Sequence, residues 1–153
     1  MKNLLSVTGI GLVFIYAIGS SLWVNTGDNW YRSLNAPAWQ PPDFIFGVIW
    51  PYNFVILGVA SYVVANRLST PKALIYLSLF AISIICALTW AYQFYQPHNL
   101  QLASVALIGT AVLTIPMILI AFRTSTPIAV ALLPYQAWVA TAATLSYQYS
   151  RLN

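Results

Sequence analysis

The side chains best suited to chemistry in this sequence are aromatic, and they recur at helical spacing. Phe46, Trp50 and Phe54 follow one another at four-residue intervals, so a helix over this stretch places all three rings on one face. Trp90 and Phe94 repeat this spacing. A third face, in the last apolar stretch, combines Trp138, Ala142, Leu145 and Tyr149. Aromatic faces bind flat apolar molecules, because each offset ring contact adds about 0.5–1.5 kcal/mol beyond the area that it buries.

Acid–base and metal chemistry have little support in the sequence. The chain holds two Asp, no Glu, one Cys and one His, so paired-carboxylate catalysis is disfavoured and no metal site with three or four protein ligands is expected. Cys86 has no partner for a disulfide within the chain and is interpreted as a small core residue. An imidazole can ligate iron axially, but His98 stands in a polar turn and is interpreted as a turn residue.

The distribution of charge requires a membrane protein. Charged residues make up 5% of the 153 residues, against about 25% in soluble domains, which excludes a water-soluble domain. The six cations are scattered, so the sequence lacks the basic stripe of a nucleic-acid-binding protein, and no nucleic-acid partner is expected. Charge-free runs cover 3–27, 44–66, 73–122 and 124–150, and a membrane-spanning helix needs about 20 apolar residues.

Five spans follow, because the run at 73–122 is long enough for two and breaks once, at the polar residues 96–99. The spans are expected at about Leu4–Val24, Phe44–Asn66, Ala73–Phe94, Leu100–Phe122 and Pro127–Tyr149. The apolar runs are continuous rather than alternating, which favours helices over a β-barrel. We therefore predict an all-α fold, an integral membrane bundle of five transmembrane helices that forms a single domain over 1–153.

The first span also has features of a signal peptide, with Lys2 before an apolar stretch and small residues near Gly19. The apolar stretch continues to Val24, which favours a retained helix. The following loop, 25–43, is rich in Trp and Pro and is expected to fold over the mouth of the bundle. Four cations lie on the side of the N-terminus and two on the other, which favours a cytoplasmic N-terminus and an external loop. The membrane is expected to be the plasma membrane.

Several motifs resemble a known family over nearly the whole chain. They are Trp30-Tyr31, Trp39-x-Pro41-Pro42-x3-Phe46-Gly47-x2-Trp50, Trp90-x3-Phe94-Tyr95 and Leu133-Pro134-Tyr135-x2-Trp138-Val139-x2-Ala142-x2-Leu145. This pattern is similar to the TspO/MBR family, the tryptophan-rich sensory proteins that are also called translocator proteins or peripheral benzodiazepine receptors. The chain departs from the family's usual pattern where Ala87 and Ser146 each replace an Asn, so hydrogen-bonding groups of the pocket are weakened or lost.

The resemblance implies a pocket that opens toward the first loop and binds tetrapyrroles, such as protoporphyrin and heme, or other hydrophobic small molecules. These molecules would be ligands, and no cofactor is required. The residues expected to contact ligand are Tyr31, Phe46, Trp50, Phe54, Trp90, Phe94, Tyr135, Trp138, Ala142, Leu145 and Ser146. Loop contacts, including contacts to ligand carboxylates, are expected from Trp30, Arg32 and Trp39. Membrane lipid and a second copy of the chain, in a homodimer, are the other expected partners.

Three functions compete. The first is a membrane receptor or carrier that sequesters a tetrapyrrole without any catalytic group. The second is a light- and oxygen-dependent porphyrin-degrading activity, in which Trp50 and Trp138 take part as redox groups. The third is a membrane scaffold without a small-molecule function, in which the same two residues are ordinary core or interface aromatics. The pair Ala87-x3-Ala91 permits close helix packing, either within the bundle or between two copies.

Overall fold

The computed structural model of the chain describes residues 1–153 and contains six α-helices and no strands. The helices are α1 (Lys2–Trp23), α2 (Asn29–Ser33), α3 (Asp43–Arg67), α4 (Thr70–Tyr95), α5 (Leu100–Phe122) and α6 (Thr126–Leu152). All except α2 are long and apolar enough to cross a bilayer. The shortest of these, α1, has 22 residues and is about 33 Å long, against a hydrocarbon thickness of about 30 Å. The predicted all-α bundle of five transmembrane helices is confirmed.

Most helix ends lie a few residues away from the ends of the expected spans. Only α5 has the expected bounds, and the other long helices extend one to three residues further at one or both ends. A hydropathy argument stops at the first charge, whereas a helix continues into the polar boundary of the membrane until a capping residue ends it. In α4 and α6, Pro71 and Pro127 occupy the first turn, where the missing N–H costs nothing.

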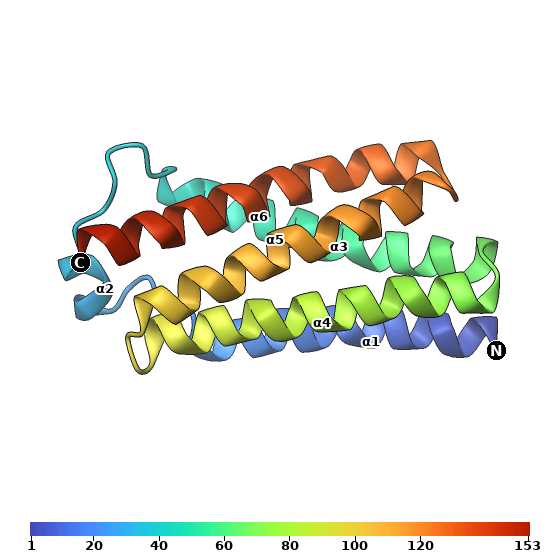
Figure 1. Cartoon of the computed structure of the whole chain (residues 1–153), viewed down its shortest axis with the longest axis horizontal. Coiled ribbons are helices and arrows are strands. Elements are labelled where there is room, and N and C mark those ends of the chain that lie inside the picture. Colours follow the sequence, from blue (N-terminus) through green and yellow to red (C-terminus); the bar gives the residue numbers. More distant parts are fainter.

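The long helices form a closed ring in the order α1, α3, α6, α5 and α4 (Figure 1). Each helix packs against the next, and α4 returns to contact α1. The two termini lie at opposite ends of the bundle, and α2 lies at the end that carries the C-terminus (Figure 1). This arrangement leaves the centre of the ring to be filled by side chains from all five helices.

Small residues set the close packing of this ring. A Cβ atom added to Gly9 of α1 would come within 2.6 Å of the Ser61 Cβ of α3. The backbone of α1 therefore packs directly against the Ser61 side chain of α3 at this position. Ala87 and Ala91 of α4 are both buried within the bundle. The Ala87-x3-Ala91 pair therefore serves packing inside the chain and does not form a surface for a second copy.

Packing is uneven along the bundle axis. A core cluster of 21 buried residues fills the half nearer the N-terminus, whereas only five buried apolar residues cluster at the loop end. Aromatic side chains that are partly buried, including Trp30, Tyr31 and Trp90, surround this smaller cluster. The loop end of the ring is therefore where the interior is incompletely filled.

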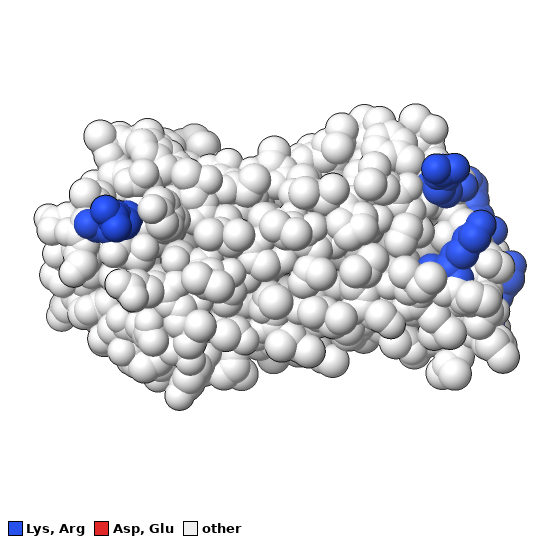
Figure 2. Space-filling model, in the orientation of Figure 1, with Lys and Arg blue, Asp and Glu red and all other residues white.

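Charged side chains lie at the two ends of the molecule and leave a broad belt without charged residues between them (Figure 2). The end that carries the N-terminus has Lys2, Arg67, Lys72 and Arg123, which stand at helix ends. Large apolar residues on the outer faces of the helices remain exposed, as expected for surfaces that contact lipid acyl chains. The chain is therefore an integral membrane protein.

Candidate ligand-binding cavity

A cavity of about 350 Å³ opens at the loop end of the bundle. This volume lies near the lower end of the roughly 300–1,000 Å³ range of pockets that bind drug-sized ligands. Side chains from α1, α2, α3, α4 and α6 and from the segment after α1 form its wall, and α5 contributes none. The lining residues are Tyr16, Ala17, Ser20, Ser21, Val24, Thr26, Tyr31, Phe46, Trp50, Phe54, Ala87, Trp90, Phe94, Tyr95, Trp138, Ala142, Leu145, Ser146 and Tyr149.

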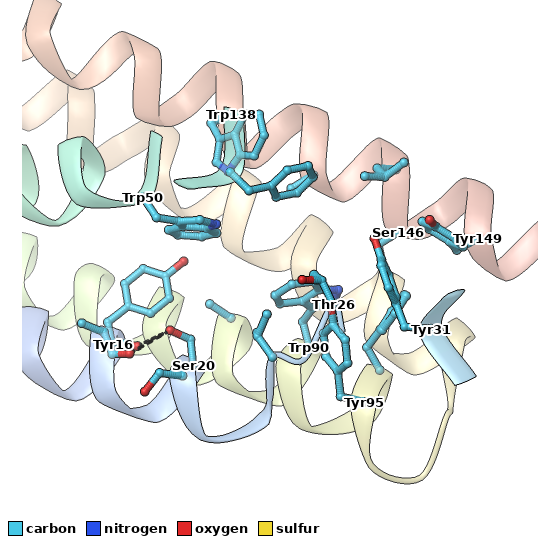
Figure 3. A pocket seen from close by; sticks show the side chains of 18 of the residues that line it. Tyr16, Ser20, Thr26, Tyr31, Trp50, Trp90, Tyr95, Trp138, Ser146 and Tyr149 are labelled. Atoms are coloured by element: carbon cyan, nitrogen blue, oxygen red, sulfur yellow. Dashed lines mark hydrogen bonds between the residues drawn. The ribbon is translucent and has the colours of Figure 1, made fainter. Parts of the chain in front are cut away.

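Trp50 of α3 and Trp138 of α6 enter the cavity from one side, and Tyr16 and Trp90 lie on the opposite side (Figure 3). The ring of Phe46 packs edge-on against Trp138, with centroids 5.0 Å apart at an interplanar angle of 82°. Trp50 contacts Tyr16 in the same edge-on manner, with centroids 6.0 Å apart. These contacts hold the indole rings in fixed orientations, so the aromatic wall exists before any ligand binds.

Small side chains create the volume between these rings. Ala142 lies one turn beyond Trp138 on α6, and Ala87 lies one turn before Trp90 on α4. On α1, Ala17 and two serines line the cavity, and the Ser20 hydroxyl is occupied because it donates to the Tyr16 carbonyl at 2.8 Å (Figure 3). A large residue at any of the alanine positions would fill the space into which the indoles point.

Four polar atoms of the lining residues are buried and have no hydrogen-bond partner within the chain. They are the Tyr16 hydroxyl, the Trp90 Nε1, the Trp138 Nε1 and the Ser146 hydroxyl. All four can donate a hydrogen bond, and leaving such a group unpaired in a buried place costs about 1–3 kcal/mol. No Lys, Arg, Asp, Glu or His lines the cavity. The cavity therefore suits a flat apolar molecule whose buried part carries no charge.

The loop between α1 and α3 covers the mouth of the cavity through α2. The Trp30 ring stacks on the His98 ring, with centroids 3.6 Å apart, and contacts Phe94 edge-on at 5.7 Å. Tyr31, the next residue, points inward and lines the cavity. α2 is thereby fixed to the turn between α4 and α5.

The C-terminus holds the second half of the same loop. The backbone N–H of Asn35 donates to the Asn153 side chain at 2.9 Å, and the Asn153 amide donates back to the Asn35 carbonyl at 3.3 Å. The Tyr149 hydroxyl of α6 is hydrogen-bonded to the side-chain carbonyl of Gln40. The segment between α1 and α3, which includes α2, thus forms a lid over the cavity. One side of this lid contacts the α4–α5 turn, and the other side is hydrogen-bonded to the end of α6.

Most residues expected to contact ligand meet in this cavity, and Tyr135 is the exception. Its ring is 1% exposed and belongs to the larger core cluster, and it does not line the cavity. The structure thus does not place Tyr135 in the cavity wall, and its contact with a ligand stays a prediction. Tyr135 lies about one turn before Trp138 on a similar face of α6, but helical periodicity gives the direction of a side chain and not its depth relative to neighbouring helices.

The three loop residues expected to contact ligand do not line the cavity. Trp30 supports the lid from outside, against His98, and Trp39 is 46% exposed. Arg32 is exposed, and its guanidinium makes no ion pair with Asp28, whose carboxylate instead accepts a hydrogen bond from the Trp30 backbone N–H at the start of α2. Trp30 thus holds α2 in place, and none of the three residues lines the cavity.

Sequence reasoning missed the wall that α1 provides. Tyr16, Ala17, Ser20, Ser21 and Val24 line the cavity, although the first span reads as a uniformly apolar helix. A signal was available, because small and hydroxyl-bearing residues recur there at three- and four-residue spacing on one face. Two further lining residues, Tyr95 and Tyr149, occur in the stretches already singled out, at the ends of α4 and α6.

Comparison with known proteins agrees with this architecture. The family model described as TspO/MBR family matches residues 7–152. The chain is 33% identical to the human translocator protein over 144 residues, which cover 89% of this chain and 82% of that protein. It is 30% identical to the tryptophan-rich protein TspO of Chlorobaculum tepidum over 147 residues, which cover 94% of this chain and 92% of that protein. With its five-helix bundle and its cavity rich in tryptophan, the chain belongs to the TspO/MBR family.

Proposed function

We propose that this protein is a membrane receptor or carrier that binds a tetrapyrrole, or a similar flat hydrophobic molecule, in the cavity beneath α2. The observation that carries the proposal is a cavity walled by aromatic rings in fixed orientations and free of charged side chains. A macrocycle offers two large π faces to the rings of Trp50, Trp90 and Trp138. A rotation of the Ser146 hydroxyl toward an acceptor of the ligand would also pair a donor that has no partner within the chain.

The same arrangement constrains how such a ligand would sit. The cavity holds no cation, so the acidic side chains of a porphyrin would stay at the mouth, near water. His98 is stacked against Trp30 outside the cavity, so the ligand would be held by ring contacts and hydrogen bonds rather than by an axial imidazole. Tyr31 of α2 lines the cavity, so a bound ligand would contact the loop through this ring (Figure 3).

A titration of the purified protein with protoporphyrin, followed by absorbance and tryptophan fluorescence, tests this proposal. In Ala142→Trp the new indole fills the cavity, and we expect the affinity to fall at least about tenfold, which corresponds to about 1.4 kcal/mol. The matched control is Ala140→Trp, which adds the same ring two residues earlier, on an exposed face of α6. Equal affinities of both variants and the wild type would overturn the proposal.

A second candidate function is light- and oxygen-dependent degradation of the bound porphyrin. The observation that favours it is the presence of two indoles, Trp50 and Trp138, on the same side of the cavity, within reach of an excited ligand and dissolved oxygen. Trp50→Phe and Trp138→Phe keep an aromatic ring but remove the readily oxidised indole. Loss of photoconversion with retained binding would support this activity, and unchanged photoconversion in both variants would refute it.

We also propose that the N-terminus faces the cytoplasm of a cell whose plasma membrane holds the protein. Four cations lie at that end of the bundle and two at the other, and cytoplasmic ends of membrane proteins are enriched in Lys and Arg. A single cysteine introduced at Asn29 in a Cys86→Ala background reports the topology. Labelling by a membrane-impermeant maleimide on intact cells supports the proposal, and labelling only after lysis contradicts it.

A further inference from the structure

A second cleft, of about 500 Å³, lies at the opposite end of the bundle from the ligand cavity. It is lined by Leu68 after α3, by Lys72 and Ile75 of α4, and by Ile120 and Arg123 at the end of α5. The cleft is therefore formed where the start of α4 and the end of α5 meet at the membrane boundary. It shares no residue with the cavity that binds the proposed ligand.

The two cations of this cleft have no partner in the chain. Neither the Lys72 ammonium nor the Arg123 guanidinium makes a hydrogen bond or an ion pair, and both side chains are exposed. The other cations of the same end are occupied, because Lys2 donates to the Asn66 carbonyl at 2.6 Å and Arg67 donates to the Thr124 carbonyl at 3.4 Å. Both aspartates of the chain lie in or beside the loop at the far end.

The cleft combines these charges with an apolar floor made of Leu68, Ile75 and Ile120. Lys72 is in the first turn of α4 and Arg123 directly follows α5, so both stand at the level of lipid headgroups. One turn deeper, Ile75 is 55% exposed and Ile120 is half-buried, at the level of acyl chains. The first turn of α4 also presents the positive end of its helix dipole at this edge.

We propose that this cleft binds one anionic phospholipid. The phosphate group pairs with the Lys72 ammonium and the Arg123 guanidinium, the latter by two parallel N–H donors, and an acyl chain lies along Ile75 and Ile120. A free phosphate ion would use the two cations but would leave the apolar floor unused. A zwitterionic lipid would bring its own cation into a site that holds two positive charges and no negative one.

Native mass spectrometry of the full chain in detergent, with phosphatidylglycerol and phosphatidylcholine added in equal amounts, tests the proposal. We expect the wild type to retain one phosphatidylglycerol in preference to phosphatidylcholine. Each of Lys72→Gln and Arg123→Gln should lower the affinity for phosphatidylglycerol about fivefold, and the double variant about 25-fold, because one cation near a lipid headgroup contributes about that much. Lys72→Arg, which keeps the charge, should bind like the wild type.

The matched control is the double variant Arg32→Gln/Arg151→Gln, which removes two charges from the other end of the bundle. It should retain phosphatidylglycerol like the wild type, and a loss equal to that of the cleft variants would show a general charge effect and overturn the proposal. Displacement of the lipid by millimolar inorganic phosphate would also overturn it, since the site would then bind an anion without its chains. The helical circular dichroism signal of each variant checks that the variant is folded. If the double variant is not folded, the affinity of either single variant tests the proposal.

Discussion

The hydroxyl of Ser146 allows a test in which stability and affinity change in opposite directions. Ser146 is 3% exposed, lines the cavity, and has no hydrogen-bond partner within the chain. Ser146→Ala removes this unpaired group and should raise the free energy of unfolding of the ligand-free protein by up to about 1–3 kcal/mol, the cost of a buried unsatisfied polar group. The same change should weaken the binding of protoporphyrin roughly 2- to 12-fold, because a hydrogen bond of about 0.5–1.5 kcal/mol is lost.

Ser83 provides the matched control for this experiment. It is 1% exposed on α4, but its hydroxyl donates to the Phe80 carbonyl at 2.7 Å, and it does not line the cavity. Ser83→Ala should therefore lower the free energy of unfolding, by about 0.6 kcal/mol for an average hydrogen bond inside a membrane protein, and leave the affinity unchanged. Any gain in helix propensity from Ser to Ala is common to both variants and cancels in the comparison.

The measurements are unfolding by SDS in mixed micelles, followed by circular dichroism, and titration with protoporphyrin. The reasoning is refuted if Ser146→Ala destabilises the protein as Ser83→Ala does and binds the porphyrin with wild-type affinity. That outcome would mean that the Ser146 hydroxyl is satisfied inside the folded chain and is not available to a ligand.

Three further predictions concern the lid, the helix packing and the core. Trp30→Ala removes the stacking on His98 and should raise the dissociation rate of protoporphyrin several-fold in stopped-flow fluorescence, with a smaller effect on the association rate. Gly9→Ala should destabilise the bundle in SDS unfolding by roughly 1–3 kcal/mol, whereas Gly11→Ala, with open space around its Cβ position, should be neutral or stabilising. Asn53→Leu should raise the unfolding free energy by about 1–3 kcal/mol, because both polar atoms of this fully buried side chain lack a partner; a loss of stability would contradict this prediction.

The transmembrane segments could be predicted from the sequence because charge is so costly in a bilayer that its absence alone marks the spans. The bounds of α5 agree with the charge-free and apolar run at 100–122. The short α2 could not be predicted in this way, since five residues show no periodicity. Its start was nevertheless encoded by Asp28, whose carboxylate caps the helix by accepting from the Trp30 backbone N–H at 3.4 Å.

The candidate site was predictable where aromatic residues repeat along one helix face, and less so where different helices must meet. Phe46, Trp50 and Phe54 line one wall together, as their spacing indicates. The contribution of α1 depends on the order of the helices in the ring, which places Tyr16 beside Trp50 and which no local pattern encodes. The depth of Tyr135 depends on the same long-range packing.

The position of a bound porphyrin is the most direct test of the central claim that the tryptophan-lined cavity is the binding site. The protein labelled with ¹³C at its alanine methyl groups, in detergent with one equivalent of protoporphyrin, gives nuclear Overhauser effects from the methyls that touch the ligand. We expect these effects from Ala17, Ala87 and Ala142, which line the cavity, and none from Ala140 on the lipid-facing side. Contacts from Ala140 without any from the three cavity alanines would place the porphyrin on the outer surface and contradict the assignment.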